Sequence, residues 1–387
     1  MVLPDANWNY PTAIRFGAGR VAELGEACRG LGIGRPLLVT DPALAKLAMV
    51  ESARSAAGAG LFCAIHSNPV GADVEAGLAA YREGGHDGVV AFGGGSALDV
   101  GKVIAFMSGQ PRPLWDFEDK EDWWSRADPA GIAPVVAVPT TAGTGSEVGR
   151  AGVILDESEG VKKIIFHPKM LPGIVILDPE LTLGLPPNVT AATGMDALSH
   201  CLEAYCAPGF HPMADGIAAE GTRLIREWLP RAVEEGGDID ARGHMLVAAS
   251  MGATAFQKGL GGMHALSHPI GALLGTHHGL TNAVLMPYIL AFNRSAIEER
   301  LARLAGYVGL ADPSFEGFLG WIVELRLRLG IPATLAELGV AAADVERIAL
   351  MAEADPSAGG NPLPFDAAAA RTVLGAAMMG RLSSSRT

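Results

Sequence analysis

The chain has few of the features that mark disulfide-bonded, membrane-embedded or nucleic-acid-binding proteins. Its 387 residues include four cysteines and no C-x-x-C pair, which favours reduced thiols and a cytoplasmic location. The net charge is -13 and no basic run occurs, so we expect neither nucleic acid nor an anionic membrane surface as a partner. No uncharged apolar run reaches the length of a membrane span. The first ten residues lack the basic and apolar regions of a secretory signal.

What the chain has in abundance is apolar residues, at 49% against 18% charged residues, which is typical of folded proteins with large cores. Short apolar runs alternate with helical patterns up to about residue 184, and only helical periods follow. The run at residues 88–92 is apolar almost throughout, as expected for a parallel sheet covered on both faces. We therefore predict an α/β domain over residues 1–185 and an all-helical domain over residues 186–387.

A glycine-rich loop follows the predicted strand at residues 88–92. The run Gly93–Ser96 ends a strand and begins a helix, so its backbone can approach a pyrophosphate while the helix N–H groups face the phosphate oxygens. A second dinucleotide-like pattern, G-x-G-x-x-A, occupies residues 17–22. A tight turn that feeds a helix explains the second pattern equally well, and we prefer the later loop as the phosphate site.

Polar residues follow two other predicted strands, and a lysine follows a predicted hairpin. Asp41 lies just past the strand at residues 37–40, where an acid can bind an adenosine ribose and repel a 2′-phosphate, which favours NAD over NADP. A helix N-cap is the alternative role for Asp41. Hydroxyls and glycines at residues 140–146 follow the strand at 133–138 and are placed to line a cofactor crevice. Lys162 could reach a ribose or a phosphate, or could be one of a solvated pair of charges with Lys163.

One aspartate and several histidines form three clusters in the second half of the chain, at Asp196–His200, His264–His268 and His277–His278. A spacing of four places two side chains on one face of a helix, one turn apart. A carboxylate with several imidazoles suits a divalent transition metal and leaves room for a substrate oxygen. A lone histidine is more often a buried structural residue, but three clusters together favour a metal site. The spacing does not select one histidine over its neighbour within the second or third cluster.

Taken in order over nearly the whole chain, these motifs resemble the iron-containing (group III) alcohol dehydrogenases. The resemblance implies an α/β N-terminal dinucleotide-binding domain and an all-α C-terminal metal-binding and catalytic domain, the fold shared with dehydroquinate synthase-like proteins. It implies the metal ligands Asp196, His200, His264 and His278, with His268 near the metal but not a ligand. It also implies the cofactor contacts Asp41, Gly94, Gly95, Ser96, Asp99, Thr140, Thr141, Thr144 and Lys162.

The same resemblance implies a metal-dependent NAD(H) alcohol dehydrogenase or aldehyde reductase that acts on a small primary alcohol or aldehyde. Its cofactors would be NAD(H) and Fe²⁺, with Zn²⁺ or another divalent ion as alternatives. The metal would act as a Lewis acid on the substrate oxygen, hydride would pass to or from nicotinamide, and His268 could relay the alcohol proton. The family also leads us to expect a homodimer.

Three residues bear on the substrate. Gly149 and Ala151 are small and would leave room near the reacting groups. Lys258 stands where many family members have an Asn-Asn-Ala sequence, and it could anchor a carboxylate, which makes an ω-hydroxy acid or semialdehyde a hypothesis for the substrate. The alternative is a lysine whose ammonium reaches solvent or pairs with a neighbouring subunit.

The alternative functions for a chain of this fold would each require a different set of residues. Glycerol dehydrogenase keeps a metal with a different ligand set, and maleylacetate reductase-like enzymes lack the metal; the intact aspartate and three histidines argue against both. A dehydroquinate synthase-like lyase would require a cluster of Lys and Arg for its phosphate-bearing substrate, and no such cluster surrounds the histidines. A non-enzymatic binding protein with this fold would be expected to have lost a metal ligand.

Overall fold

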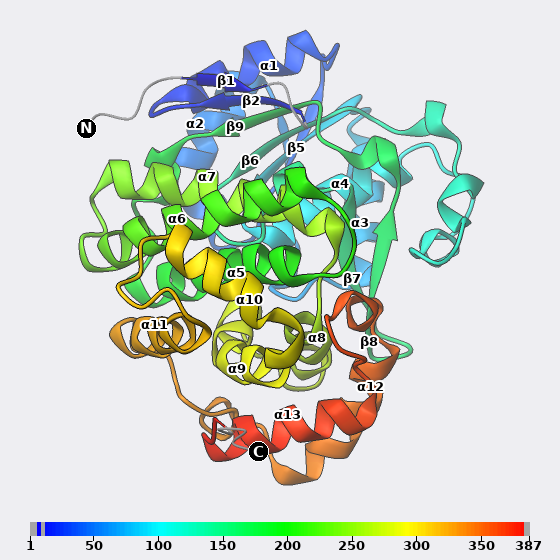
Figure 1. Cartoon of the computed structure of the whole chain (residues 1–387). Coiled ribbons are helices and arrows are strands. Elements are labelled where there is room, and N and C mark those ends of the chain that lie inside the picture. The colour runs from blue at the N-terminus through cyan, green and yellow to red at the C-terminus, as the bar shows by residue number, and fades with distance from the viewer. Residues whose placement is uncertain (1–5, 9–11, 383–387) are drawn as a thin grey trace. The chain divides into compact units, whose positions relative to one another are not determined.

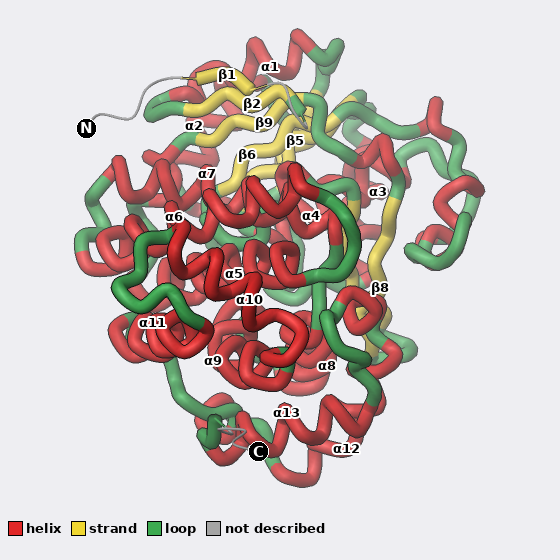
Figure 2. Tube along the Cα trace, viewed as in Figure 1, coloured by secondary structure: helices red, strands yellow, loops and turns green. Residues whose placement is uncertain are grey.

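The computed structural model describes residues 6–8 and 12–382. The chain forms two compact units, Met1–Gly184 and Leu185–Thr387. Strands occur in the first unit, whereas the described part of the second is built from helices and loops (Figure 2). Within the described residues, no helix is both long enough and apolar enough to cross a membrane.

A seven-stranded sheet is the centre of the first unit (Figure 1). Every neighbouring pair in it is parallel except the first, in which β1 runs antiparallel to β2 at one edge. The central strands are buried along their whole length, which explains their continuous apolar sequences. In sheet order the strands are β1 (Ala6–Trp8), β2 (Ala13–Phe16), β9 (Ile174–Leu177), β6 (Val135–Pro139), β5 (Gly88–Gly93), β3 (Pro36–Val39) and β4 (Gly60–Phe62).

Helices connect the parallel strands and pack on the sheet. Leu24 of α1 and Val50 of α2 share one core with Leu38, Phe92 and Ile176 from the sheet. A separate antiparallel hairpin, β7 (Ala151–Asp156) with β8 (Val161–Phe166), lies outside the main sheet. The α-helices of this unit are α1 (Leu24–Gly30), α2 (Ala48–Ala57), α3 (Gly71–Glu83) and α4 (Gly95–Met107).

Two local features concern the first half of this unit. β4 is only three residues long, because only Gly60–Phe62 pairs with β3. In the turn at residues 17–22, the N–H groups that could have bound a phosphate are already bonded within the protein. Gly19 and Val21 donate theirs to the carboxylate of Asp178 at 3.1 and 2.9 Å. The turn therefore feeds a helix and closes on a neighbouring loop of the same unit.

The second unit consists of helices around an apolar interior. Its longest helices pair side by side, α5 against α6 and α6 against α7, and present mainly alanine, leucine and methionine to one another. The helices are α5 (Pro187–Cys206), α6 (Pro212–Glu234), α7 (Ile239–Ala255), α8 (Gly262–Leu274), α9 (His278–Phe292), α10 (Arg294–Tyr307), α11 (Phe315–Arg328), α12 (Val345–Ala354) and α13 (Ala367–Met379).

Candidate active site: metal centre and cofactor loops

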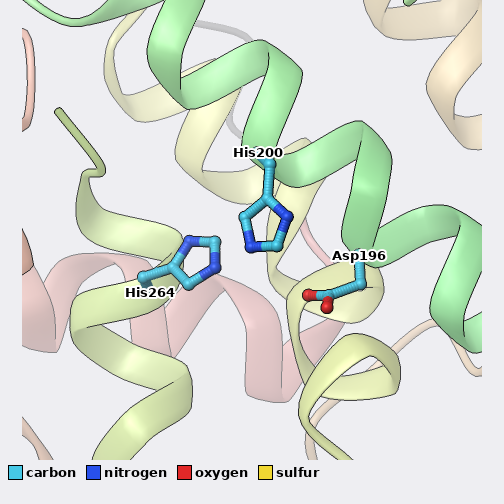
Figure 3. A group of neighbouring side chains, drawn as sticks. All are labelled: Asp196, His200 and His264. Atoms are coloured by element: carbon cyan, nitrogen blue, oxygen red, sulfur yellow. The ribbon is translucent and has the colours of Figure 1, made fainter. Parts of the chain in front are cut away.

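The centre of the candidate site is a group of three buried side chains. The helical period of α5 places Asp196 and His200 one turn apart on one face, and α8 supplies His264. One ligand atom from each residue lies within 4.8 Å of the other two. Figure 3 shows the three side chains pointing toward a common space. Each is at most 4% exposed, so a carboxylate and two imidazoles meet away from solvent.

The structure separates the two adjacent histidines at the start of α9. α8 ends at Leu274 and is capped by Gly275, whose φ of +66° is the left-handed conformation that glycine adopts readily. His277 is the N-cap of α9, and its Nδ1 accepts a hydrogen bond from the N–H of Leu280 at 3.4 Å. His278 is the first helical residue, and its Nε2 lies 3.6 Å from Oδ1 of Asp196. His278 is therefore the member of the pair that reaches the buried group.

A glycine brings α9 close enough to α5 for that approach. A Cβ atom at Gly279 would lie 2.4 Å from the carbonyl oxygen of Ala192 and 2.8 Å from Cβ of Asp196. Both distances are shorter than real contacts, so only glycine fits at this crossing. The position of His278 beside Asp196 thus depends on its neighbour in the chain.

The atoms of this group that face one another carry lone pairs and could bind a cation. The amide nitrogen of Asn282 stands 2.9 Å from Oδ1 of Asp196, 3.3 Å from Nε2 of His264 and 3.2 Å from Nε2 of His278. Three acceptor atoms from three segments thus converge on one donor nitrogen. One carboxylate and three imidazoles, counting His200, form a nitrogen- and oxygen-rich set that suits iron(II) or zinc.

Two side chains from distant segments hold the beginning of α8. The N-cap residue is a glycine and has no side chain to accept from the first N–H groups. Instead, Gly262 donates to Oδ1 of Asn361 at 3.1 Å, and Met263 donates to Oε1 of Glu203 at 2.7 Å. The other oxygen of Glu203 lies 2.6 Å from Nδ1 of His264. Burial disfavours the charged imidazole of His264, but the adjacent Glu203 carboxylate, together with the charges of Asp196 and Asp355, raises the pKa of His264.

His268 has a carboxylate partner of its own. Its Nδ1 lies 2.8 Å from Oδ2 of Asp355, and its ring stacks on that of His278 with 5.5 Å between centroids. Burial would raise the pKa of Asp355, but His268 and the N–H of Ser357 hold it below its usual value. Because Nδ1 is engaged by Asp355, Nε2 is the nitrogen of His268 through which a proton could be exchanged.

The predicted cofactor residues of the first unit gather at the carboxyl ends of β5 and β6. A Cβ atom at Gly95 would lie 2.6 Å from Cγ2 of Thr144, and one at Gly94 would lie 3.5 Å from Thr141. Thr140 donates its N–H to the last residue of β5 at 2.9 Å. The glycine loop (Gly93–Ser96) and the threonine loop (Thr140–Ser146) are therefore in contact. The start of α4 has no capping side chain, so its first N–H groups are available to a ligand. This is the arrangement that accommodates a pyrophosphate at a helix N-terminus.

Two other predicted cofactor residues have local hydrogen bonds. Oδ1 of Asp41 accepts from the N–H groups of Ala43 and Leu44, both at 2.9 Å, so the carboxylate shapes the loop after β3. The hydroxyl of Ser96 donates to the carbonyl of Ser67 at 2.7 Å. Because β3 and β5 are neighbouring parallel strands, Asp41, after β3, and Ser96, in the glycine loop after β5, lie at the same carboxyl edge of the sheet.

Asp99 joins α4 to two other segments. Its carboxylate accepts from the hydroxyl of Ser146 at 2.5 Å and from the N–H of Val153 at 3.1 Å. The ammonium of Lys102 lies 3.4 Å away, and burial lowers the pKa of this lysine. These contacts fix the threonine loop and the β7–β8 hairpin to α4, and a direct contact between Asp99 and the cofactor stays a prediction.

The predicted residues of the hairpin lie beside this network. Gly149 directly follows the 3₁₀ turn Ser146–Val148. Ala151 is the first residue of β7, and its carbonyl accepts a hydrogen bond from Lys102. Lys162 lies on β8. The structure therefore places Gly149 and Ala151 at the end of the threonine loop and Lys162 in the second strand of the hairpin.

Lys258 is engaged inside the helical unit. Its side chain is 2% exposed, and its ammonium donates to Oδ1 of Asp215 at 2.6 Å. Arg300 pairs with the other oxygen of Asp215 at 2.9 Å. One aspartate thus neutralises part of the charge of two cations, and the role of Lys258 as a substrate anchor stays a prediction.

The residues that contact the ring nitrogens of the histidines are not among the predicted site residues. Glu203 follows His200 by three positions on α5, and Asn282 follows His278 by four on α9, so helical spacing could have indicated both. Asp355 reaches His268 across 87 positions of the chain, and no local pattern indicates such a contact. Asn361, which accepts from the N–H of Gly262 rather than from a histidine, is likewise distant in the chain from its partner.

A parallel sheet with a glycine loop at its carboxyl edge and a helical unit with a buried aspartate–histidine group define a metal-dependent oxidoreductase that uses a dinucleotide. Two family models cover most of the chain: "Iron-containing alcohol dehydrogenase" over residues 11–179 and "Fe-containing alcohol dehydrogenase family, C-terminal" over residues 190–378. The chain belongs to the iron-containing alcohol dehydrogenase family.

Individual relatives agree with this membership. A 4-hydroxybutyrate dehydrogenase of Cupriavidus necator is 42% identical and aligns over 94% of this chain and 98% of its own. The crystal structure of a 1,3-propanediol oxidoreductase has a TM-score of 0.90 at 34% identity, over 98% of this chain and 100% of that one. A sulfoacetaldehyde reductase of Bifidobacterium kashiwanohense, solved with NAD⁺, has a TM-score of 0.86 at 29% identity, over 97% and 99% of the two chains.

These comparisons confirm several predictions made from the sequence. The fold class, an α/β dinucleotide-binding unit followed by helices, is that of the family. The enzyme class, an alcohol or aldehyde oxidoreductase, is confirmed as well. So is the pair of cofactors, NAD(H) and a divalent metal.

Proposed function

We propose that this protein oxidises a small ω-hydroxy acid, or reduces the corresponding semialdehyde, with NAD(H) and iron(II). The observation that carries the proposal is the buried donor group of Asp196, His200 and His264, to which His278 adds a nitrogen 3.6 Å from Asp196. Zinc suits the same donors. We assign the metal and catalytic role to residues 186–387 and the dinucleotide role to residues 1–185.

Each residue has a distinct part in this proposal. The four donor residues would hold the metal, which when bound acts as a Lewis acid on the substrate oxygen. Burial of the group excludes water from the donor atoms. His268, oriented by Asp355, would transfer the alcohol proton through Nε2. The glycine and threonine loops would bind the pyrophosphate, and Asp41 would bind the ribose and disfavour a 2′-phosphate.

The acidic substrate is supported by the names of two relatives. One is named a 4-hydroxybutyrate dehydrogenase and another a sulfoacetaldehyde reductase, and both names specify an anionic molecule. The 1,3-propanediol oxidoreductase is named for a neutral diol. Since the relative named for 4-hydroxybutyrate is 42% identical over 94% of this chain, we favour the anionic class.

Composition and family membership support a proposal for the cellular location, the partners and the oligomeric state. With a net charge of -13 and reduced cysteines expected, we propose a cytoplasmic protein that does not bind nucleic acid. The resemblance to the family supports a homodimer.

Metal content and substrate range test the proposal together. We expect about one iron or zinc ion per chain by elemental analysis, and turnover that is lost on chelation and restored by Fe²⁺. A panel of 4-hydroxybutyrate, succinic semialdehyde, butanol and 1,3-propanediol should rank the anionic pair first by kcat/KM. Full turnover of the metal-free protein would overturn the metal role and favour a metal-independent maleylacetate reductase-like reaction. A preference for butanol would overturn only the substrate class.

A further inference from the structure

Glu203 contacts a predicted metal ligand and the helix that carries this ligand. It projects from α5, the helix of Asp196 and His200, and is 5% exposed. One carboxylate oxygen lies 2.6 Å from Nδ1 of His264, and the other accepts the N–H of Met263 at 2.7 Å. A single side chain therefore ties the imidazole and the first turn of α8 to the helix that supplies two other donors.

These contacts fix which nitrogen of His264 can bind a metal. A carboxylate can only accept, so Nδ1 carries the hydrogen, and in the neutral imidazole that binds a metal Nε2 keeps its lone pair. The other side of the ring agrees, because the amide nitrogen of Asn282, a donor, lies 3.3 Å from Nε2. The ring therefore presents an acceptor atom to the space that it shares with Asp196 and His200.

We propose that Glu203 is a positioning residue of the metal centre. It holds His264 in the tautomer and orientation that bind a divalent ion and fixes the distance between α8 and α5. The inference rests on the proposed metal site and adds a residue that does not itself touch the metal. A partner of this kind sets both the direction and the basicity of a ligating imidazole.

A purely structural role would have a different signature. If Glu203 served only to cap α8, its loss would lower the stability of the metal-free protein and leave the affinity of the folded protein for metal unchanged. If it positions His264, its loss also weakens metal binding by the folded protein. Metal affinity, measured apart from activity, separates the two roles.

The test is the variant Glu203→Gln. Glutamine has a single side-chain acceptor, so it cannot serve both His264 Nδ1 and the Met263 N–H. Metal-free protein is titrated with Co²⁺ while its visible d–d spectrum is recorded, and Zn²⁺ affinity is measured by competition with a chelator. We expect the Zn²⁺ dissociation constant to rise about 10- to 100-fold, as for other partners of ligating histidines, and the Co²⁺ spectrum to change.

Asp355→Asn is the matched control. It makes the same carboxylate-to-amide change on the partner of His268, a histidine on the same helix that is not a predicted ligand. We expect its Zn²⁺ dissociation constant to stay within about threefold of the wild-type value, since only ligand partners tune affinity strongly. Equal weakening in both variants would mean a general loosening of α8 and would overturn the inference.

The remaining outcomes are also decisive. A wild-type protein that binds Zn²⁺ no better than Asp196→Ala would refute the proposed metal site itself. If Glu203→Gln binds Zn²⁺ as tightly as the wild-type protein while Asp196→Ala does not bind it, only the role of Glu203 is refuted. If Glu203→Gln does not fold, Glu203→Asp replaces it, because the shorter side chain keeps the charge but cannot span both partners. In a His264→Ala background, substitution of Glu203 should have no further effect on Zn²⁺ affinity.

Discussion

His268 and Asp355 form a largely buried imidazole–carboxylate pair, with 2.8 Å between Nδ1 and Oδ2. Their side chains are 13% and 11% exposed, so little solvent competes with the contact. Asp355 is itself fixed, because its other oxygen accepts the N–H of Ser357 at 2.8 Å. The imidazole is thus held by a group whose own position is determined by the turn that follows α12.

The first prediction concerns turnover in Asp355→Asn. An amide at this position can present its NH₂ group to Nδ1 and reverse the tautomer of His268, which would remove the acceptor at Nε2. We expect kcat for alcohol oxidation to fall by at least about tenfold, a part of the 10²–10⁴-fold effect that a general acid–base group provides. Steady-state kinetics with NAD⁺ and butanol check this. Unchanged kcat would show that His268 does not handle the proton.

Substitution at the crossing of α5 and α9 should act on the metal site. In Gly279→Ala the new methyl group would meet the carbonyl of Ala192 at 2.4 Å and must push the helices apart. We expect a loss of about 1–3 kcal/mol in the free energy of unfolding and weaker Zn²⁺ binding, because overpacking shifts the backbone. Chemical denaturation and metal titration measure the two effects.

Gly216→Ala is the control for that substitution. Gly216 is exposed in the interior of α6, and no atom lies within 4 Å of its added Cβ. Alanine there should stabilise the protein by about 0.4–1 kcal/mol through helix propensity and a less disordered unfolded chain. A similar loss in both variants would contradict the packing argument.

Lys258→Ala distinguishes an ion pair from a substrate anchor. Since the ammonium is 2% exposed and bonded to Asp215, we expect about 1–3 kcal/mol of lost stability from the loss of this hydrogen bond between charged groups, although Arg300 still pairs with Asp215. The KM values for 4-hydroxybutyrate and butanol should change by the same factor. A rise confined to the anionic substrate would instead assign Lys258 to its carboxylate.

The β7–β8 hairpin should contribute to stability in a pH-dependent way. Burial would raise the pKa of Asp156, but hydrogen bonds from Lys163 and Ser158 lower it to about 2. A lowered folded-state pKa stabilises the protein fully above the ordinary value of 3.8, and this contribution is lost as the pH falls toward 2. Asp156→Asn should therefore unfold more easily than wild type near neutral pH, and the difference should shrink in acid. A pH-independent difference in urea denaturation would refute this account.

The fold and the centre of the site follow from patterns within short segments. Buried parallel strands leave continuous apolar runs, as in β5, and the strand-end loops carry glycine, serine and threonine. A spacing of four on one helix revealed Asp196 with His200 and His264 with His268. These features could be predicted because one segment contains all the information that produces them.

The remainder depends on contacts between distant segments. The spacing of His277 and His278 could not show which one reaches Asp196, since this depends on where α9 begins and on the close approach at Gly279. The buried pairing of Lys258 with Asp215 spans 43 positions and could not be inferred from either segment. Such contacts are fixed by tertiary packing.

Two of the contacts that hold α8 in place come from a segment that is synthesised late. Gly262 donates to Asn361, and His268 is held by Asp355, so the helix that carries His264 gains two of its supports from a segment about one hundred residues further on. A growing chain presents Asp196, His200 and His264 well before that segment has been made. Because domains fold as units during synthesis, we expect the helical unit to acquire its metal after the segment at residues 355–361 has left the ribosome. Stalled chains that lack this whole segment, and not only the Asp355 carboxylate, would then be poor metal acceptors, although they contain all four predicted ligands.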